Sequence, residues 1–172
     1  MSDKILVAFA SRSGATKGVA ETIGNSLAEK GLAVDICSMQ DVKDISSYRA
    51  IIAGSAIQAG KWLPEATEFV KKYQKELSGK PFAAFLVCMT LAMPKGEAYR
   101  KHVSSWLEPV RNMVKPVHEG LFAGTLDISK VPGLGDRIKF RLSVLFGFWK
   151  EGDHRNWEEI RKWAEELREL IC

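Results

Sequence analysis

The sequence is poor in the residues that build metal sites and disulfide frameworks. Its 172 residues hold three histidines and three cysteines, and the cysteines lie far apart at positions 37, 88 and 172. Because they form no CxxC pair, neither a zinc site nor a disulfide framework is indicated. No apolar run approaches the roughly 20 residues of a membrane-spanning helix, and the N-terminus lacks the pattern of a secretory signal. We therefore expect a cytoplasmic protein.

Catalytic signatures carried by the protein itself are also lacking. No histidine has a serine or cysteine partner at a recognisable spacing, so no nucleophilic triad and no catalytic residue are predicted. No grouping of His, Asp and Glu indicates a metal ion. Cys88 ends a strongly apolar run, and we interpret it as a packing residue rather than a reactive thiol.

Charge is concentrated in one segment. The net charge is +4, and residues 128–150 hold five basic residues against one acid. The rest of the chain is balanced and has no stripe of basic residues interleaved with aromatic ones, so we expect no nucleic-acid binding. The hydrophobic content is 46%, and no linker or repeat divides the chain. These features predict a single domain over residues 1–172.

Apolar runs alternate with helical patterns along most of the chain. Strands are predicted over 4–10, 33–37, 50–55, 81–88 and 117–123, and helices over 17–30, 64–77, 95–113 and from Asn156 onward. The continuous apolar character of the strands is typical of strands buried on both faces. Alternation of this kind predicts a parallel sheet with helices on both sides.

An insertion of about residues 127–152 interrupts this alternation near the last strand. Five apolar residues in it recur at helical spacing beside Arg137 and Arg141, namely Ile138, Leu142, Leu145, Phe146 and Trp149. A basic amphipathic helix of this kind can lie on an anionic membrane or meet an apolar substrate. The alternative is that the stripe packs on its own domain or on a second subunit of a homodimer.

A short polar loop joins the first predicted strand to the first predicted helix. It consists of Ser11, Arg12, Ser13, Gly14, Ala15 and Thr16. At this edge of a parallel sheet, backbone amides and the positive end of a helix dipole favour an anion. The loop has neither a GxGxxG pattern nor a P-loop lysine, so a monophosphate is the better match. An ordinary capped turn remains the alternative.

This loop resembles the hydroxyl-rich phosphate loop of the flavodoxins. The resemblance implies a flavodoxin-like three-layer sandwich with five parallel strands in the order 2-1-3-4-5, and FMN as the cofactor. It also implies that two loops enclose the flavin ring, here Ser55, Ala56, Ile57, Gln58, Ala59, Gly60 and Trp62 in one and Met89, Thr90, Leu91 and Ala92 in the other. Trp62 would stack on the ring or, alternatively, pack at the start of a helix.

Longer stretches resemble the flavodoxin-domain branch that includes the menaquinone-dependent protoporphyrinogen IX dehydrogenases. They are GSAIQAGKWLPEA, LFAGTLD and EGDHRNWEEIRKWA. The resemblance implies an FMN-dependent electron carrier that exchanges electrons with a redox protein such as ferredoxin. The alternative is a dehydrogenase that passes electrons from protoporphyrinogen IX to a quinone at the inner face of the membrane. In that case Phe146, Phe148 and Trp149 would line the approach to the flavin. A scaffold that has lost the flavin is disfavoured by the hydroxyl-rich loop.

Overall fold

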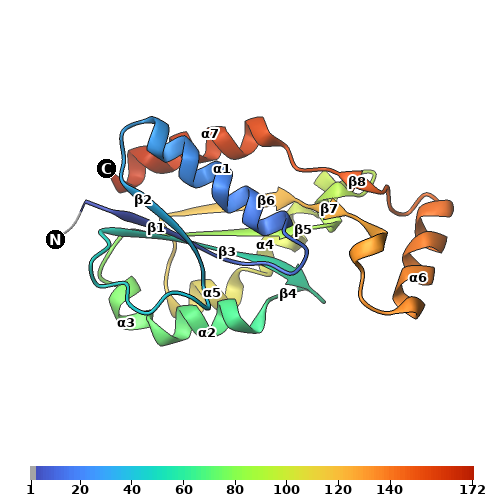
Figure 1. The fold of residues 1–172 in the computed structure, drawn as a ribbon, viewed down its shortest axis with the longest axis horizontal. Coiled ribbons are helices and arrows are strands. Elements are labelled where there is room, and N and C mark those ends of the chain that lie inside the picture. The colour runs from blue at the N-terminus through green and yellow to red at the C-terminus, as the bar shows by residue number, and fades with distance from the viewer. Residues whose placement is uncertain (1–2) are drawn as a thin grey trace.

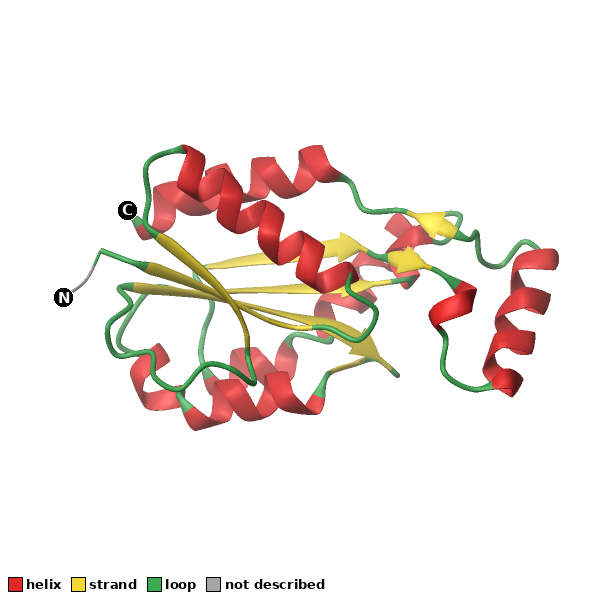
Figure 2. Ribbon diagram, in the orientation of Figure 1, coloured by secondary structure: helices red, strands yellow, loops and turns green. Residues whose placement is uncertain are grey.

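The computed structural model describes residues 3–172 and has a parallel sheet between two layers of helices (Figures 1 and 2). The sheet order is β2-β1-β3-β5-β6. These parallel strands are β1 (Ile5–Ala10), β2 (Val34–Ser38), β3 (Ala50–Gln58), β5 (Phe82–Cys88) and β6 (His118–Ala123). Numbered among themselves, they follow the predicted order 2-1-3-4-5. The predicted fold class is therefore confirmed.

Helices cover both faces of the sheet. One layer holds α1 (Ala15–Glu29) and α7 (Trp157–Ile171), and the other holds α2 (Pro64–Lys72), α3 (Gln74–Leu77), α4 (Arg100–Ser105) and α5 (Glu108–Met113). Successive strand residues face opposite layers, so Ile5 and Val7 pack in the α1–α7 core while Leu6 and Ala8 pack in the other core. Two covered faces explain the uninterrupted apolar runs of the strands.

Two predicted helices are each divided in the structure. The segment expected to be helical over 95–113 forms η2 (Gly96–Tyr99), α4 and α5. Pro109 lies in the first turn of α5, where a missing N–H costs nothing; inside a longer helix its ring would clash with the preceding turn. The segment expected over 64–77 divides into α2 and α3 at Tyr73.

The segment between β6 and α7 has its own small elements. They are β7 (Thr125–Leu126), η3 (Ile128–Lys130), α6 (Leu134–Leu145) and β8 (Gly152–Asp153), and β7 pairs antiparallel with β8. Figure 1 shows α6 standing away from the sandwich, beyond the carboxyl ends of the strands. The predicted helical stripe was wrong in one respect, because α6 ends at Leu145 and Gly147 takes a positive φ of 78°. Trp149 therefore does not continue that helix.

Within residues 3–172, no helix combines the length and the apolar character that crossing a membrane requires.

Candidate functional site

A cavity of about 200 Å³ lies at the carboxyl ends of β1, β3 and β5. This edge is where loops of a doubly wound sheet meet. The predicted site residues that line it are Ser11, Arg12, Ser13, Ala15, Thr16, Ala56, Ile57, Gln58 and Met89. The fold thus gathers residues from three separate stretches of sequence into one place.

The polar end of the cavity is the N-terminus of α1. Gly14 occupies the N-cap position with a φ of 92°, and its N–H donates to Ser11 Oγ at 3.1 Å. No side chain among residues 3–172 caps the amides of the first turn, and that turn contains no acidic residue. By contrast, Asn156 caps α7 by accepting a hydrogen bond from the N–H of Glu159. The start of α1 therefore presents open amide donors and the positive end of the helix dipole.

Thr16 supplies the most specific sign of a ligand. Its side chain is 1% exposed, and its Oγ1 has no hydrogen-bond partner within the described part of the chain. Leaving a buried hydroxyl unsatisfied costs about 1–3 kcal/mol, so such groups usually meet an acceptor that belongs to a ligand or water. Together with the uncapped amides, this hydroxyl forms a donor set that fits a phosphate group.

Arg12 lines the cavity but binds a protein carboxylate. Its guanidinium forms a two-point ion pair with Glu65 in the first turn of α2, with Nη2 3.0 Å from Oε2. The hydrogen bond from Arg12 lowers the pKa of Glu65 below its usual value. The pair ties the α1 loop to the opposite helical layer, and Glu65 offsets the charge that Arg12 brings to the cavity.

The remaining wall of the cavity is mainly apolar. Ala56, Ile57, Leu63, Val87 and Met89 contribute to it, and no Asp or Glu lies among the described residues that line it. Cys88 also borders it, and burial raises the pKa of its thiol. The thiol is therefore protonated near neutral pH, as expected for a packing residue. The cavity thus places an apolar lining beside the polar donors of the α1 loop.

Several predicted site residues support the cavity without lining it. Ser55 is buried; its hydroxyl donates to the carbonyl of Ala56 at 2.7 Å and accepts from the N–H of Leu63 at 3.0 Å. These bonds hold the hairpin between β3 and β4 (Lys61–Trp62). Ala59 and Gly60 form its turn, both with positive φ, which fits a type I′ turn.

Trp62 and most of the second predicted loop lie outside the set of described residues that line this cavity, whereas Met89 of that loop belongs to it. Trp62 is 6% exposed and packs in the hydrophobic core on the α2–α5 side of the sheet. Thr90, Leu91 and Ala92 form η1 (Thr90–Ala92) directly after Met89. Phe146 and Phe148 project into solvent, 71% and 61% exposed. Neither they nor Trp149 are among the described residues that line this cavity.

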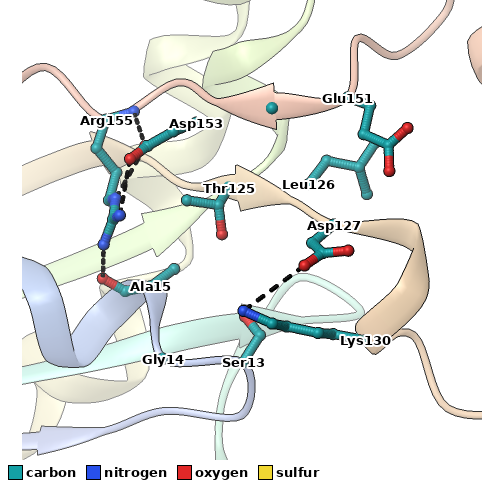
Figure 3. Close-up of a pocket in the computed structure, with 11 residues that line it drawn as sticks. Ser13, Gly14, Ala15, Thr125, Leu126, Asp127, Lys130, Glu151, Asp153 and Arg155 are labelled. Carbon is teal, nitrogen blue, oxygen red and sulfur yellow. Dashed lines mark hydrogen bonds and ion pairs between the residues drawn. The ribbon is translucent and has the colours of Figure 1, made fainter.

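A second cavity of about 540 Å³ adjoins the first, and Ser13, Ala15 and Thr125 line both (Figure 3). Ser13, Gly14 and Ala15 border it from the loop; the segment between β6 and α7 contributes Thr125, Leu126, Asp127, Lys130, Glu151, Gly152, Asp153 and Arg155. None of the residues from this segment was predicted from the sequence as a site residue. The signal that could have found two residues of the site is the carboxyl end of the last strand, because Gly124 and Thr125 follow it; both line the first cavity, and Thr125 also lines the second.

Comparison with known families agrees with this geometry. Residues 6–146 match the model of a family described as "Flavodoxin domain". The chain belongs to the flavodoxin family. Flavodoxin 2 from Bacillus cereus has a similar structure, with 25% identity and a TM-score of 0.61 over 97% of this chain and 99% of that one. Fusobacterium nucleatum flavodoxin bound to flavin mononucleotide is 13% identical with a TM-score of 0.58, covering 98% of this chain and 99% of that one.

Among curated proteins, this flavodoxin-family chain is similar to protoporphyrinogen IX dehydrogenase [quinone] from Escherichia coli strain K12. The two are 22% identical over 174 residues, which cover 97% of this chain and 96% of the relative. The resemblance noted in the sequence thus extends over nearly the whole length of both proteins.

Proposed function

We propose that the protein binds FMN in the cavity at the α1 loop and functions as an electron-transfer protein. The observation that carries this proposal is the buried, unpartnered hydroxyl of Thr16 at the uncapped N-terminus of α1. The flavodoxin from Fusobacterium nucleatum, which has the same fold, is a complex with flavin mononucleotide. Ser11, Ser13 and Thr16, with the first amides of α1, hold the phosphate.

The residues that line the cavity indicate what the protein contributes beside the chemistry of the flavin. A flavin supplies the electron-transfer chemistry when it is bound. The protein anchors the phosphate and surrounds the ring with apolar groups such as Ile57 and Met89. Because the walls of this cavity lack carboxylates among the described residues, they add no negative charge that would oppose reduction. In this role the partner is a redox protein such as ferredoxin.

A second function is favoured by the uncovered face of α6. Phe140 and Val144 are half-buried on one side of this helix. Leu134, Ile138, Leu142 and Leu145 are exposed on the other, where their spacing places them along one stripe. An apolar stripe of this kind on a projecting helix is unusual unless something covers it. An apolar electron acceptor such as a quinone would be reached where this stripe meets a lipid surface.

The basic residues beside this apolar stripe favour an anionic lipid surface as the partner that covers it. Arg137 and Arg141 flank it on one side and Lys139 on the other, while Asp136 in the first turn is paired with Lys139. Apolar area bordered by basic residues binds anionic membranes at their interface. In this second function the protein lies at the inner face of the membrane and oxidises protoporphyrinogen IX with a quinone as acceptor, the activity that names the relative from Escherichia coli.

An anaerobic assay separates the two functions. The FMN-loaded protein is mixed either with a reduced low-potential ferredoxin or with protoporphyrinogen IX and a menaquinone analogue. Rapid reduction by ferredoxin without porphyrin formation supports the carrier and eliminates the dehydrogenase. Catalytic porphyrin formation that is lost when residues 131–150 are deleted supports the dehydrogenase and eliminates the simple carrier.

Vesicle sedimentation tests the lipid contact separately. The double variant Ile138→Ser, Leu142→Ser should lose binding to vesicles that contain phosphatidylglycerol, and wild-type binding should fall as salt is added. Leu170→Ser is the matched control, because Leu170 on α7 is 51% exposed, against 50% and 49% for the two α6 residues. If wild type ignores the vesicles and the double variant instead abolishes a dimer, the stripe is a subunit interface.

A further inference from the structure

Arg155 links β8, the return strand of the insertion, to α1, the helix that follows the phosphate loop. It follows β8, and its Nη1 donates to the carbonyl oxygen of Ala15 at 3.2 Å. Its Nε and Nη2 donate to the two carboxylate oxygens of Asp153 at 2.9 and 2.7 Å. Figure 3 shows the guanidinium reaching from Asp153 on one side to Ala15 on the other. One side chain thus joins segments 140 residues apart in the sequence.

The surroundings of Arg155 fix its orientation. The guanidinium lies over the indole of Trp157, 4.4 Å from the ring centroid. It also packs against Gly18 of α1, where an added Cβ would lie 2.4 Å from Nη1. The side chain is 16% exposed. Most surface arginines are mobile, whereas this one is held by a carboxylate, an aromatic face and a helix backbone.

Asp153 completes the arrangement. The hydrogen bonds from Arg155 are the main cause of a pKa for Asp153 below its usual value, so the carboxylate stays charged near neutral pH. A charged, two-point partner keeps the planar guanidinium in one orientation. The remaining donor, Nη1, is then directed at Ala15, which immediately precedes Thr16 in the first turn of α1.

We infer that Arg155 is a positioning residue for the phosphate loop, and that Asp153 and Gly18 hold it in place. The inference rests on the proposed function, because it assumes that the α1 loop binds the phosphate of FMN. The contact with Ala15 fixes the first turn of α1, and with it the Thr16 hydroxyl and the neighbouring amides. Affinity for a phosphate-bearing flavin thereby depends on the return strand of the insertion.

Asp153→Asn distinguishes positioning from simple attraction by charge. If Arg155 only contributed positive charge, removing the nearby carboxylate would strengthen the binding of an anionic phosphate. Under the positioning role, the same change frees the guanidinium and weakens phosphate binding. The two roles therefore predict opposite changes in FMN affinity for the single substitution Asp153→Asn.

The experiment is an equilibrium titration of the full-length apoprotein with FMN and with riboflavin, which lacks the phosphate. Arg155→Gln, Arg155→Lys, Asp153→Asn and Gly18→Ala should each weaken FMN by about three- to tenfold, the range expected for one hydrogen bond. Riboflavin affinity should stay unchanged. Arg155→Lys keeps the charge but loses the two-point geometry, so it should not restore FMN binding. Arg161→Gln is the control, because Arg161 is an exposed residue of α7 outside the cavity.

The outcomes separate this inference from the proposed function. Thermal unfolding of each apoprotein identifies variants that fail to fold, and the ratio of FMN to riboflavin affinity is compared only among folded ones. FMN binding to Asp153→Asn that is as tight as, or tighter than, wild type overturns the positioning role. Equal loss of both flavins in the Arg155 variants overturns it as well. If wild type itself does not prefer FMN to riboflavin, the proposed function fails first.

Discussion

Thr16→Val should stabilise the apoprotein and weaken its cofactor binding. The Thr16 side chain is 1% exposed and its hydroxyl lacks a partner among the described residues. Valine replaces that hydroxyl with a methyl group of similar size and keeps the branched Cβ. Since an unsatisfied buried polar group costs about 1–3 kcal/mol, its removal should raise the free energy of unfolding by about 1 kcal/mol or more. For a domain of this size, that corresponds to about 2–4 °C in Tm.

Although Thr16→Val should stabilise the apoprotein, it should weaken the binding of FMN. A hydrogen bond to a charged group is worth about 1.5–3 kcal/mol, so FMN affinity should fall roughly ten- to hundredfold. Riboflavin affinity should remain unchanged, because riboflavin has no phosphate for the hydroxyl to contact. The assays are thermal unfolding of the apoprotein and fluorescence titration with each flavin.

Thr22→Val is the matched control on the same helix. The Thr22 hydroxyl donates to the carbonyl of Gly18 at 3.0 Å, so its removal breaks a satisfied hydrogen bond and should not stabilise the protein. Thr22 does not line the cavity formed by the described residues, and FMN affinity should not change. The reasoning is refuted if Thr16→Val lowers the Tm of the apoprotein, or if it weakens FMN and riboflavin equally.

Three further changes test other parts of the structure. Gly54→Ala should destabilise the protein by about 1–3 kcal/mol in denaturant unfolding, because an added Cβ would lie 1.9 Å from the Phe85 ring; unchanged stability would contradict this packing. Burial and the hydrogen bond to Asp35 raise the pKa of Tyr48 to about 12. The stability that this shift contributes is therefore complete below about pH 10 and lost as pH rises toward 12, and Tyr48→Phe should flatten that alkaline loss in unfolding scans. Trp62→Phe should leave the absorption and fluorescence of bound flavin unchanged, since Trp62 lies in the core; an altered spectrum would place it on the ring.

The sequence predicts the sheet well because its signals are local. Continuous apolar runs mark strands that are covered on both faces, and each run appears in the structure within a few residues of its predicted bounds. The break before α5 was also present in the sequence, because Pro109 cannot occupy the interior of a helix. The two-residue strands β4, β7 and β8 are too short to show any periodicity.

The candidate site, too, could be predicted from the sequence only where its residues have a local signal. The loop of residues 11–16 could be located because it follows a buried strand and opens a helix. The direction of Trp62 could not, because a shift of one residue in a strand turns a side chain to the opposite face. Contacts such as Arg12 with Glu65, or Arg155 with Ala15, join distant segments and depend on how helices pack. No local pattern encodes them.

The central claim is that the α1 loop recognises the phosphate of FMN, and titration of the wild-type apoprotein with FMN, riboflavin and FAD tests it most directly. The donors at Ser11, Ser13, Thr16 and the first turn of α1 predict FMN binding at least about tenfold tighter than riboflavin, on the scale of one hydrogen bond to a charged group. FMN should also bind more tightly than FAD, because the loop suits a terminal phosphate. Equal affinity for FMN and riboflavin, or no binding of either, would contradict the account.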